Sequence, residues 1–385
     1  MQNFDLHNPT HIVFGKETVG RLNDLVPAGA RVLILYGGES ARRTGTLDEV
    51  RAALGDRAVV EFGGIEPNPS YETLMRAVEM IHRQGLNFLL AVGGGSVIDG
   101  TKFVAAAVHY KGDAWDIMET HGAVVEQAMP FGCVLTLPAT GSEMNKGSVV
   151  TKAATKAKLV FASDHVYPRF SILDPTKTYS LPLPQVANGV VDAFTHVMEQ
   201  YMTYPVDGRV QDRFAEGLLQ TLIEIGPRVL AESDNYDARA NLMWTATMAL
   251  NGLIAAGVPE DWSTHMIGHE LTALHGIDHA RTLAIVLPAN MQVRREAKRD
   301  KLLQYAERVW DITEGDVEQR IDAAIGHTRA FFESMGVPTR LRDYDIGAKH
   351  IDAVIQQLEA HGMTALGERG DVTLAQSRRI LEASL

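Results

Sequence analysis

Asp192 and His196 lie four residues apart in the segment GVVDAFTHVMEQY, residues 189–201. In a helix this spacing puts both side chains on one face, where a carboxylate and an imidazole could bind a divalent metal ion. Val190 and Phe194 recur at helical spacing on the opposite face, which is also the pattern of an ordinary helix with one solvated side. The pair could therefore be two metal ligands or an i,i+4 surface pair, and this segment alone does not decide.

A second stretch, STHMIGHELTALHGIDHARTLAIVLP at residues 263–288, concentrates four of the fourteen histidines. HEL at 269–271 is not followed by the second histidine of the HExxH pattern, which excludes the zinc-protease motif. Imidazoles at this density indicate metal binding, although some members of such a cluster are usually structural. We expect two of the four to bind a metal, the candidates being His265, His269, His275 and His279.

The turn between the two predicted helices of this stretch bears on which histidines meet. The helix that carries His265 and His269 is predicted to end at Gly276 in a left-handed conformation. His279 then begins the next helix, which Pro288 is predicted to stop. Such a turn can bring His265 and His279 together.

The first part of the chain has a different pattern from the histidine-rich part. It alternates short apolar runs with longer helical patterns at about 40–54, 70–84 and 96–109, which is typical of βαβ units around a parallel sheet. The predicted strands are RVLILY (31–36), VVEF (59–62), NFLLAV (87–92), CVLTL (133–137) and, as the last strand, FSILDP (170–175).

Helical patterns alone follow the last predicted strand, and Pro182 and Pro184 punctuate the boundary. We therefore predict an α/β, Rossmann-like nucleotide-binding domain at residues 1–178 and an all-α domain at residues 179–385 that carries the histidines.

Three polar or glycine-rich loops follow predicted strands: YGGES at 36–40, GGGSVIDGTK at 93–102 and TLPATGSE at 136–143. The second is not GxGxxG, because Ile98 occupies the third glycine position. Its three glycines still let the backbone approach a phosphate, and Ser96 can cap the following helix. Since the carboxyl ends of parallel strands lie at one edge of a sheet, the three loops are expected to face one ligand.

Composition narrows the class of ligand. The 385 residues are 45% hydrophobic and 22% charged, which suffices for two substantial cores. A net charge of -12 argues against a nucleic-acid or anionic-membrane partner and leaves a small molecule as the expected substrate. Cys133 is the single cysteine, so any metal must be held by nitrogen and oxygen ligands. Neither a signal peptide nor a membrane span is indicated, and we expect a cytoplasmic protein.

These motifs together resemble the iron-containing (group III) alcohol dehydrogenase family. DAFTH at 192–196 and HMIGHELTALHGIDHA at 265–280 are similar to its metal-binding segments, and the two longer loops stand where it has nucleotide loops. FDLHNPTHIVFGK and GGIEPNPSYETLM resemble the branch of butanol dehydrogenases and broad-specificity NADPH-dependent aldehyde reductases. The similarity runs from near residue 4 to the carboxyl terminus. It implies the dehydroquinate synthase-like fold of this family, an α/β nucleotide-binding domain followed by an all-α metal-binding domain.

The resemblance also implies a site. Its metal ligands fall on Asp192, His196, His265 and His279, a donor set that suits Fe(II) or Zn(II). His269 falls where the family has a histidine between metal and nicotinamide, as a proton relay, a cofactor-positioning group or a hydrogen-bonded neighbour of the ligands. The cofactor contacts implied are Asn68 beside the adenine, Gly94, Gly95 and Ser96 at the pyrophosphate, and Asp99, Thr136, Thr140, Ser142, Asn145 and Lys158 toward the ribose and nicotinamide. Lys158 could equally be an exposed strand lysine.

The loop after the first predicted strand favours NADP(H) over NAD(H). Gly37 and Gly38 leave room for a 2′-phosphate, and Ser40 can donate a hydrogen bond to it. Glu39 departs from the glycine often found there in the resembling branch, and it either points to solvent or works against that preference. Positive charge can come from two neighbouring arginines, Arg42 and Arg43, which could also be a solvated helix face.

We therefore expect a metal-dependent alcohol dehydrogenase or aldehyde reductase that transfers a hydride reversibly between NADP(H) and short- to medium-chain aldehydes or primary alcohols. The alternatives are a glycerol dehydrogenase-like or dehydroquinate synthase-like enzyme on the same fold, or a non-catalytic nucleotide or metal sensor. The strand-like amino-terminal segment FDLHNPTHIVF could pair across a two-fold axis, so a homodimer is expected.

Overall fold

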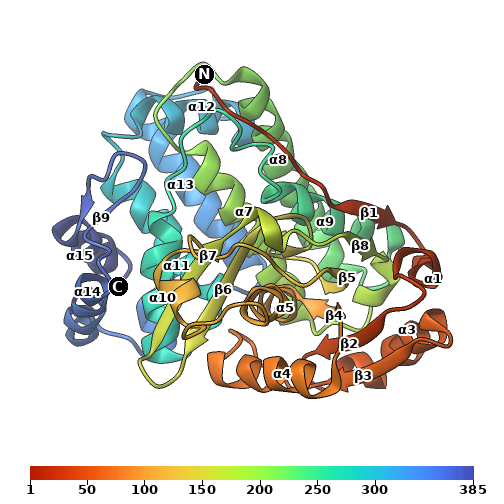
Figure 1. The fold of residues 1–385 in the computed structure, drawn as a ribbon. Coiled ribbons are helices and arrows are strands. Elements are labelled where there is room, and N and C mark those ends of the chain that lie inside the picture. The colour runs from red at the N-terminus through yellow and green to blue at the C-terminus, as the bar shows by residue number, and fades with distance from the viewer. The chain divides into compact units, whose positions relative to one another are not determined.

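The computed structural model describes residues 1–385, and its backbone separates into two compact units (Figure 1). The sheet unit comprises His7–Leu181 and Asp234–Thr247. The helical unit comprises Met1–Leu6, Pro182–Ser233 and Met248–Leu385. The division into domains at residues 1–178 and 179–385 stays a prediction, since compactness alone does not define an independently folding domain.

The sheet unit is built on a six-stranded sheet in the order β1-β8-β5-β4-β2-β3, and each neighbouring pair in it is parallel. The five strand runs that the sequence indicated all lie in this sheet. The bounds are β1 His11–Phe14, β2 Arg31–Tyr36, β3 Ala58–Phe62, β4 Phe88–Gly94, β5 Phe131–Leu137 and β8 Phe170–Leu173.

Alternation along the strands creates a core on each face of the sheet. Val32 and Ile34 of β2 point into one hydrophobic cluster, whereas Leu33 and Leu35 point into the other. Because both faces are covered, the strands read as continuous apolar runs. Helix α5, Gly95–Ala107, packs against β4 within the second cluster (Figure 1).

The helices predicted at 40–54 and 70–84 are present in the sheet unit, which also contains three helices that were not predicted there. One predicted helix, at 40–54, is divided into two because Gly45 between them adopts a φ of 76°. The hydroxyl of Ser70 caps the next helix by accepting a hydrogen bond from the Thr73 N–H at 3.3 Å. The bounds are α1 Leu22–Leu25, α2 Ser40–Arg43, α3 Thr46–Leu54, α4 Tyr71–Gln84, α6 Asp116–Glu119 and α9 Tyr236–Ala249, of which all but the last two residues belong to this unit.

Two antiparallel strand pairs were not predicted. In the sheet unit β6, Gly147–Lys152, pairs with β7, Ala157–Ala162. In the helical unit β9, Ala365–Leu366, pairs with β10, Val372–Thr373. FSILDP is therefore not the last strand, and the carboxyl-terminal part is helical apart from this short pair.

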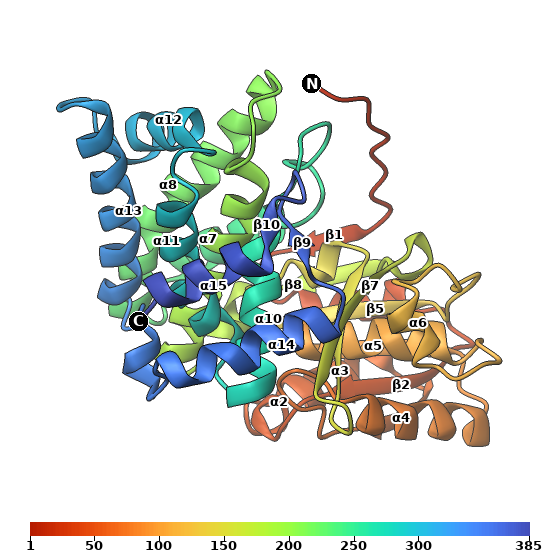
Figure 2. The ribbon, with the colours of Figure 1, turned by 90° about the vertical axis from the view of Figure 1, so that its left-hand side faces the viewer.

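The helical unit packs its helices around their apolar faces. One core joins Leu271, Ile285, Val354 and Leu381, which come from four different helices, and Figure 2 shows α14 and α15 beside α10. No helix of the chain is long and apolar enough to cross a membrane. The bounds are α7 Leu183–Tyr201, α8 Arg209–Ala231, α10 Ser263–His275, α11 His279–Val293, α12 Arg299–Trp310, α13 Val317–Ser334, α14 Ile351–Ala360 and α15 Leu374–Ala383.

Candidate metal centre and nucleotide loops

The polar face of α7 is buried. Asp192 is 3% exposed and His196 is 4% exposed, and every residue from Gly189 to Tyr201 is buried. A solvated surface pair is therefore excluded. The His196 Nε2 lies 3.8 Å from the Asp192 Oδ1, so the four-residue spacing does bring the two side chains together.

The histidine-rich stretch forms the predicted helix, turn and helix. Gly276 ends α10 with a φ of 68°, and His279 begins α11 three residues later. Pro288 does not stop α11, as the sequence had suggested, but lies inside it, and the helix continues to Val293. Pro288 is itself buried, and the packing around α11 supplies the stabilisation that offsets its missing backbone donor.

The turn brings ligand atoms from two helices to the carboxylate of α7. One ligand atom each from Asp192, His265 and His279 forms a group in which all lie within 4.8 Å of one another. The His279 Nε2 is 3.7 Å from the Asp192 Oδ1. The ring of His196 stacks on that of His265 at a centroid distance of 4.7 Å, although His196 is not part of the three-residue group.

This donor set fits a divalent cation. A carboxylate buried among imidazoles favours a cation that accepts both oxygen and nitrogen ligands. Fe(II) and Zn(II) both meet that requirement, and the distances between the ligand atoms allow one ion to be shared.

The other two histidines of the stretch differ in position. His269 is 3% exposed, and its ring centroid lies 5.1 Å from that of His279 and 6.4 Å from that of His265. His275 is turned toward His350, 5.5 Å away between centroids. Burial and the neighbouring His350 lower the pKa of His275. His269 therefore borders the cluster, and His275 lies outside it.

Two residues beside the cluster were not predicted from the sequence as part of the site. Glu199 is 2% exposed, and its Oε1 accepts a hydrogen bond from the His265 backbone N–H at 2.9 Å and contacts the His265 Nδ1 at 3.1 Å. Its position seven residues after Asp192, on the same helix face, was the available signal. Trp262 adopts a φ of 61°, and its indole packs edge-on against His265 at 5.1 Å. No sequence pattern indicates that conformation for a tryptophan.

In the sheet unit, the three predicted loops follow β2, β4 and β5, which are adjacent parallel strands, so the loops do share one edge. The glycines of the middle loop leave no room for side chains. A Cβ on Gly94 would lie 2.9 Å from the Leu137 Cβ, and one on Gly95 would lie 2.4 Å from the Thr140 Cγ2. The backbone is therefore the surface that this loop presents.

Ser96 does not cap α5, contrary to the prediction. The helix begins at Gly95 with Gly94 as its N-cap and without a capping side chain, and the Ser96 hydroxyl instead accepts from the Asn68 N–H at 3.3 Å. An uncapped helix start with backbone N–H groups and a positive dipole end suits an anion such as a pyrophosphate.

Hydrogen bonds join most of the remaining predicted cofactor residues. Asp99 accepts from the Ser142 hydroxyl at 2.5 Å, and the Thr140 hydroxyl accepts from the Ser142 N–H at 3.2 Å. Lys158 is 4% exposed and donates to Asn68 at 2.9 Å, so it is not an exposed strand lysine. Thr136 is half-buried near the end of β5.

Lys102 was not predicted as a site residue, and its hydrogen bonds hold the segment that follows the TLPATGSE loop. It is fully buried and donates to the Asn145 Oδ1 at 2.8 Å and to the Gly147 carbonyl at 2.7 Å. Burial lowers the pKa of Lys102 to about 8, although Asp99 acts in the opposite direction. The spacing from Asp99 to Lys102 was the only sequence signal.

The first loop leaves space beside β2. A Cβ at Gly38 would meet nothing within 4 Å, and Ser40 is exposed at the start of α2. Arg42 donates to the Tyr36 hydroxyl at 2.7 Å and to Glu61 at 2.9 Å, which ties its guanidinium to its own unit. Arg43 is exposed, and the Glu39 side chain is 72% exposed and lies 3.5 Å from Arg42.

Comparison with known proteins gives matches along the whole chain. The family described as "Iron-containing alcohol dehydrogenase" matches residues 9–175, and "Fe-containing alcohol dehydrogenase family, C-terminal" matches residues 186–374. The "NADPH-dependent aldehyde reductase YqhD" of Escherichia coli (strain K12) is 61% identical over 386 residues, which cover 100% of both chains. The "Probable NADH-dependent butanol dehydrogenase 1" of Bacillus subtilis (strain 168) is 42% identical, again over 100% of both chains. A crystal structure of E. coli K-12 YqhD superposes with a TM-score of 0.99 and 60% identity, covering 100% of this chain and 99% of the other.

Proposed function

Since this chain belongs to the iron-containing alcohol dehydrogenase family, we propose that it is a metal-dependent aldehyde reductase that also runs in reverse as an alcohol dehydrogenase. It transfers a hydride between NADP(H) and short- to medium-chain aldehydes or primary alcohols. The observation that carries the proposal is the buried group of Asp192, His265 and His279, whose donor atoms suit one divalent ion.

Asp192, His196, His265 and His279 hold the metal in this proposal. A divalent ion bound there supplies Lewis acidity to a carbonyl oxygen, and a nicotinamide supplies the hydride. The protein contributes position and exclusion of water, since three of the four ligands are 4% exposed or less. His279, the most open of them, has a side chain 23% exposed.

His269 is proposed to move or hold the proton that the alcohol oxygen gains or loses. Its ring borders the ligand group at 5.1 Å from His279, and it is not one of the three grouped ligands. A His269→Gln variant should therefore keep its metal while kcat falls by about 10²-fold or more, the usual contribution of a positioned acid or base. An unchanged kcat would make His269 a structural neighbour of the ligands.

The nucleotide is proposed to lie on the loops after β2, β4 and β5. Gly94 and Gly95 face the pyrophosphate with backbone N–H groups, and Gly38 and Ser40 accommodate the 2′-phosphate. The relative from E. coli is named as NADPH-dependent, whereas the one from B. subtilis is named as NADH-dependent. NADP(H) follows from the closer relative and from the open space at Gly38.

We also propose that the protein is a homodimer and is located in the cytoplasm. Strand β1 lies at the edge of the sheet, bonded on one side to β8, and so offers a free edge to the same strand of a second chain. A mass by light scattering near twice 42.1 kDa is expected. A monomer mass would overturn the dimer without touching the catalytic proposal.

The deciding experiment is NADPH oxidation with butanal by the purified protein, before chelation, after chelation, and after addition of Fe(II) or Zn(II). Activity should vanish and return with one of the two metals. Retained NADPH binding without turnover in every state would contradict the proposal and favour a lyase or a sensor on the same fold. His265→Ala should retain NADPH binding and lose turnover.

A further inference from the structure

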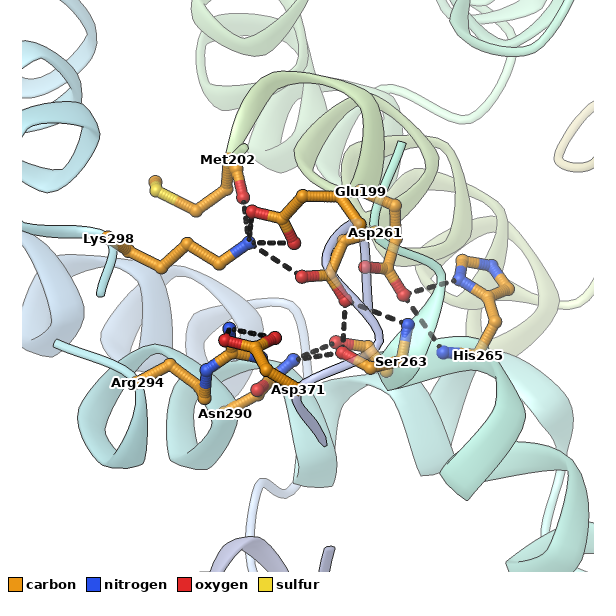
Figure 3. Close-up of polar contacts among 11 residues, drawn as sticks. Glu199, Met202, Asp261, Ser263, His265, Asn290, Arg294, Lys298 and Asp371 are labelled. Carbon is orange, nitrogen blue, oxygen red and sulfur yellow. Dashed lines mark hydrogen bonds and ion pairs between the residues drawn. The ribbon is translucent and has the colours of Figure 1, made fainter. Parts of the chain in front are cut away.

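A buried network of charged side chains lies directly behind the metal ligand His265 (Figure 3). It begins at Glu199 on α7, whose Oε1 accepts from the His265 backbone N–H at 2.9 Å. The same oxygen lies 3.1 Å from the Nδ1 of the His265 ring. One carboxyl oxygen thus holds both the backbone and the imidazole of a single ligand.

The contact at Nδ1 determines which ring nitrogen is left for a metal. A neutral imidazole that donates its proton from Nδ1 carries its lone pair on Nε2. Glu199 can accept from that N–H whether its carboxyl is ionised or protonated, because a carboxyl retains acceptor oxygen in both states. The contact therefore selects one tautomer of His265 and fixes the plane of its ring.

We propose that Glu199 is a positioning residue for the metal centre, a role that rests on the proposed function. It orients His265 so that Nε2 is the ligand atom that joins Asp192 and His279. Carboxylates in this position behind metal-bound histidines commonly raise metal affinity 10- to 100-fold.

Glu199 is itself held in place by the segment that leads into α10. The Asp261 N–H donates to the Glu199 carbonyl at 2.9 Å, and Asp261 in turn accepts from the Ser263 N–H at 2.9 Å. Lys298 donates to the Asp261 Oδ2 at 2.6 Å and to the Met202 carbonyl just after α7 at 2.7 Å. These bonds tie the end of α7 to the start of α10, the two places that carry Glu199 and His265.

The network also reaches the turn between β9 and β10. Lys298 donates to the Glu368 carboxyl at 2.6 and 2.7 Å. A separate pair holds the same turn, because Arg294 donates to both oxygens of Asp371 at 2.8 and 2.9 Å. Figure 3 shows Lys298 and Arg294 on one side of Asp261 and His265 on the other. The support of the metal ligand therefore extends through three separate segments of the helical unit.

A purely structural role for Glu199 makes a different prediction. Its bond to the His265 N–H satisfies one backbone donor in the first turn of α10, and an alanine there would weaken that helix start by about 1 kcal/mol whether or not a metal binds. A positioning role additionally requires that metal affinity change. The two roles separate when metal binding and the stability of the metal-free protein are measured side by side.

The test measures Zn(II) affinity of the full chain by competition with a chromophoric chelator, and the absorption spectrum of the Co(II)-loaded protein. Glu199→Ala should lower Zn(II) affinity about 10- to 100-fold and alter the Co(II) bands. Glu199→Gln should lose less, because its amide oxygen can still accept from Nδ1. Glu216→Gln is the matched control, since Glu216 is also a buried glutamate of this unit, at 4% exposure, and its hydrogen bonds go to Tyr201, Arg213, Gln304 and Arg308.

Wild-type affinity in Glu199→Ala, or an equal loss in Glu216→Gln, would overturn the positioning role. If Glu199→Ala does not fold, Glu199→Met, which keeps the length of the side chain and removes the acceptor, decides, and an unchanged affinity and Co(II) spectrum in that variant would overturn the proposal. Asp192→Ala is measured first. If the wild type binds no metal, or binds it equally without Asp192, the proposed metal centre itself fails and the positioning role fails with it.

Discussion

Replacing Lys298 with methionine tests how the buried charges of the helical unit are balanced. Lys298 is 4% exposed, and its ammonium bridges Asp261 and Glu368, whose side chains are 3% and 2% exposed. Methionine has nearly the same length and no charge, so the variant leaves two buried carboxyls without their cation. Removing one partner from a buried ion pair costs about 3–5 kcal/mol. Spread over a unit of this size, that corresponds to a fall in Tm of roughly 6–20 °C.

The pH dependence of the loss of stability in Lys298→Met distinguishes the effect of the missing charge from the effect of lost packing. Burial opposes ionisation of Asp261, but the charge of Lys298 and hydrogen bonds with Glu368, Lys298 and Ser263 outweigh it and lower the pKa of Asp261 to about 2. Glu368 shares the same ammonium, and burial together with Asp261 raises its pKa. In the wild type the contribution of Asp261 is present above pH 3.8 and is lost as the pH falls through about 2.

In Lys298→Met the part of that stabilisation that Lys298 supplies is gone, and its charge no longer opposes the effect of burial on the two carboxyls. The deficit relative to wild type should therefore be largest at pH 7 and shrink toward pH 4, where protonation removes the uncompensated charge. Adding Glu368→Gln to Lys298→Met should restore part of the stability at pH 7. Thermal unfolding of the four proteins, the Glu368→Gln single variant included, is the assay. A Lys298→Met variant within 1 °C of wild type, or a double variant no better than it, would refute the reasoning.

Three further outcomes are expected in the sheet unit. Gly95→Ala would place a Cβ 2.4 Å from the Thr140 Cγ2 and should weaken NADPH binding by about 1–3 kcal/mol in a fluorescence titration, with an unchanged Kd counting against the proposed cradle. The folded pKa of Lys102, about 8, lies below the usual 10.5, so the unfolded chain keeps that proton up to a higher pH than the folded protein does. The free energy of unfolding of wild type relative to Lys102→Met should therefore rise by about 3 kcal/mol from pH 8 to 10.5. A difference that does not change with pH would contradict this. Burial raises the pKa of Cys133 to about 12, so a thiol reagent at pH 8 should label it only after unfolding, and rapid labelling of the native protein would show that it is accessible.

Most of the fold could be predicted from local patterns in the sequence. Most predicted strands of the parallel sheet are apolar runs whose alternate residues enter two different cores, and this property is visible within six residues. The turn at Gly276 was equally local, because only the glycine and the two flanking helical patterns were needed. Ser96 and Pro288 show the limit of such rules: each has the residue type of a helix boundary, and tertiary contacts set the boundary elsewhere.

Contacts between distant segments could not be predicted in this way. Glu199 and His265 are 66 residues apart, and Lys298 and Glu368 are 70 apart. The β6–β7 hairpin was missed because VVTKAATKAKLVF mixes lysines into both strands, and only the structure shows Lys158 buried against Asn68. A charged residue in such a segment reads as exposed unless its partner is known.

Helix α7 shows why the sequence alone could not decide whether its polar face binds a metal or is solvated. Periodicity reports that one face is polar, and it contains no information about what covers that face. Asp192, His196 and Glu199 follow one another at spacings of four and three, so the same stripe would suit a solvated helix. Once other helices bury the stripe, a carboxylate among imidazoles favours a bound cation, and a second carboxyl is favoured where it accepts hydrogen bonds. Burial thus turns an ordinary polar face into two proposed metal ligands and, one turn further on, the residue that orients a third.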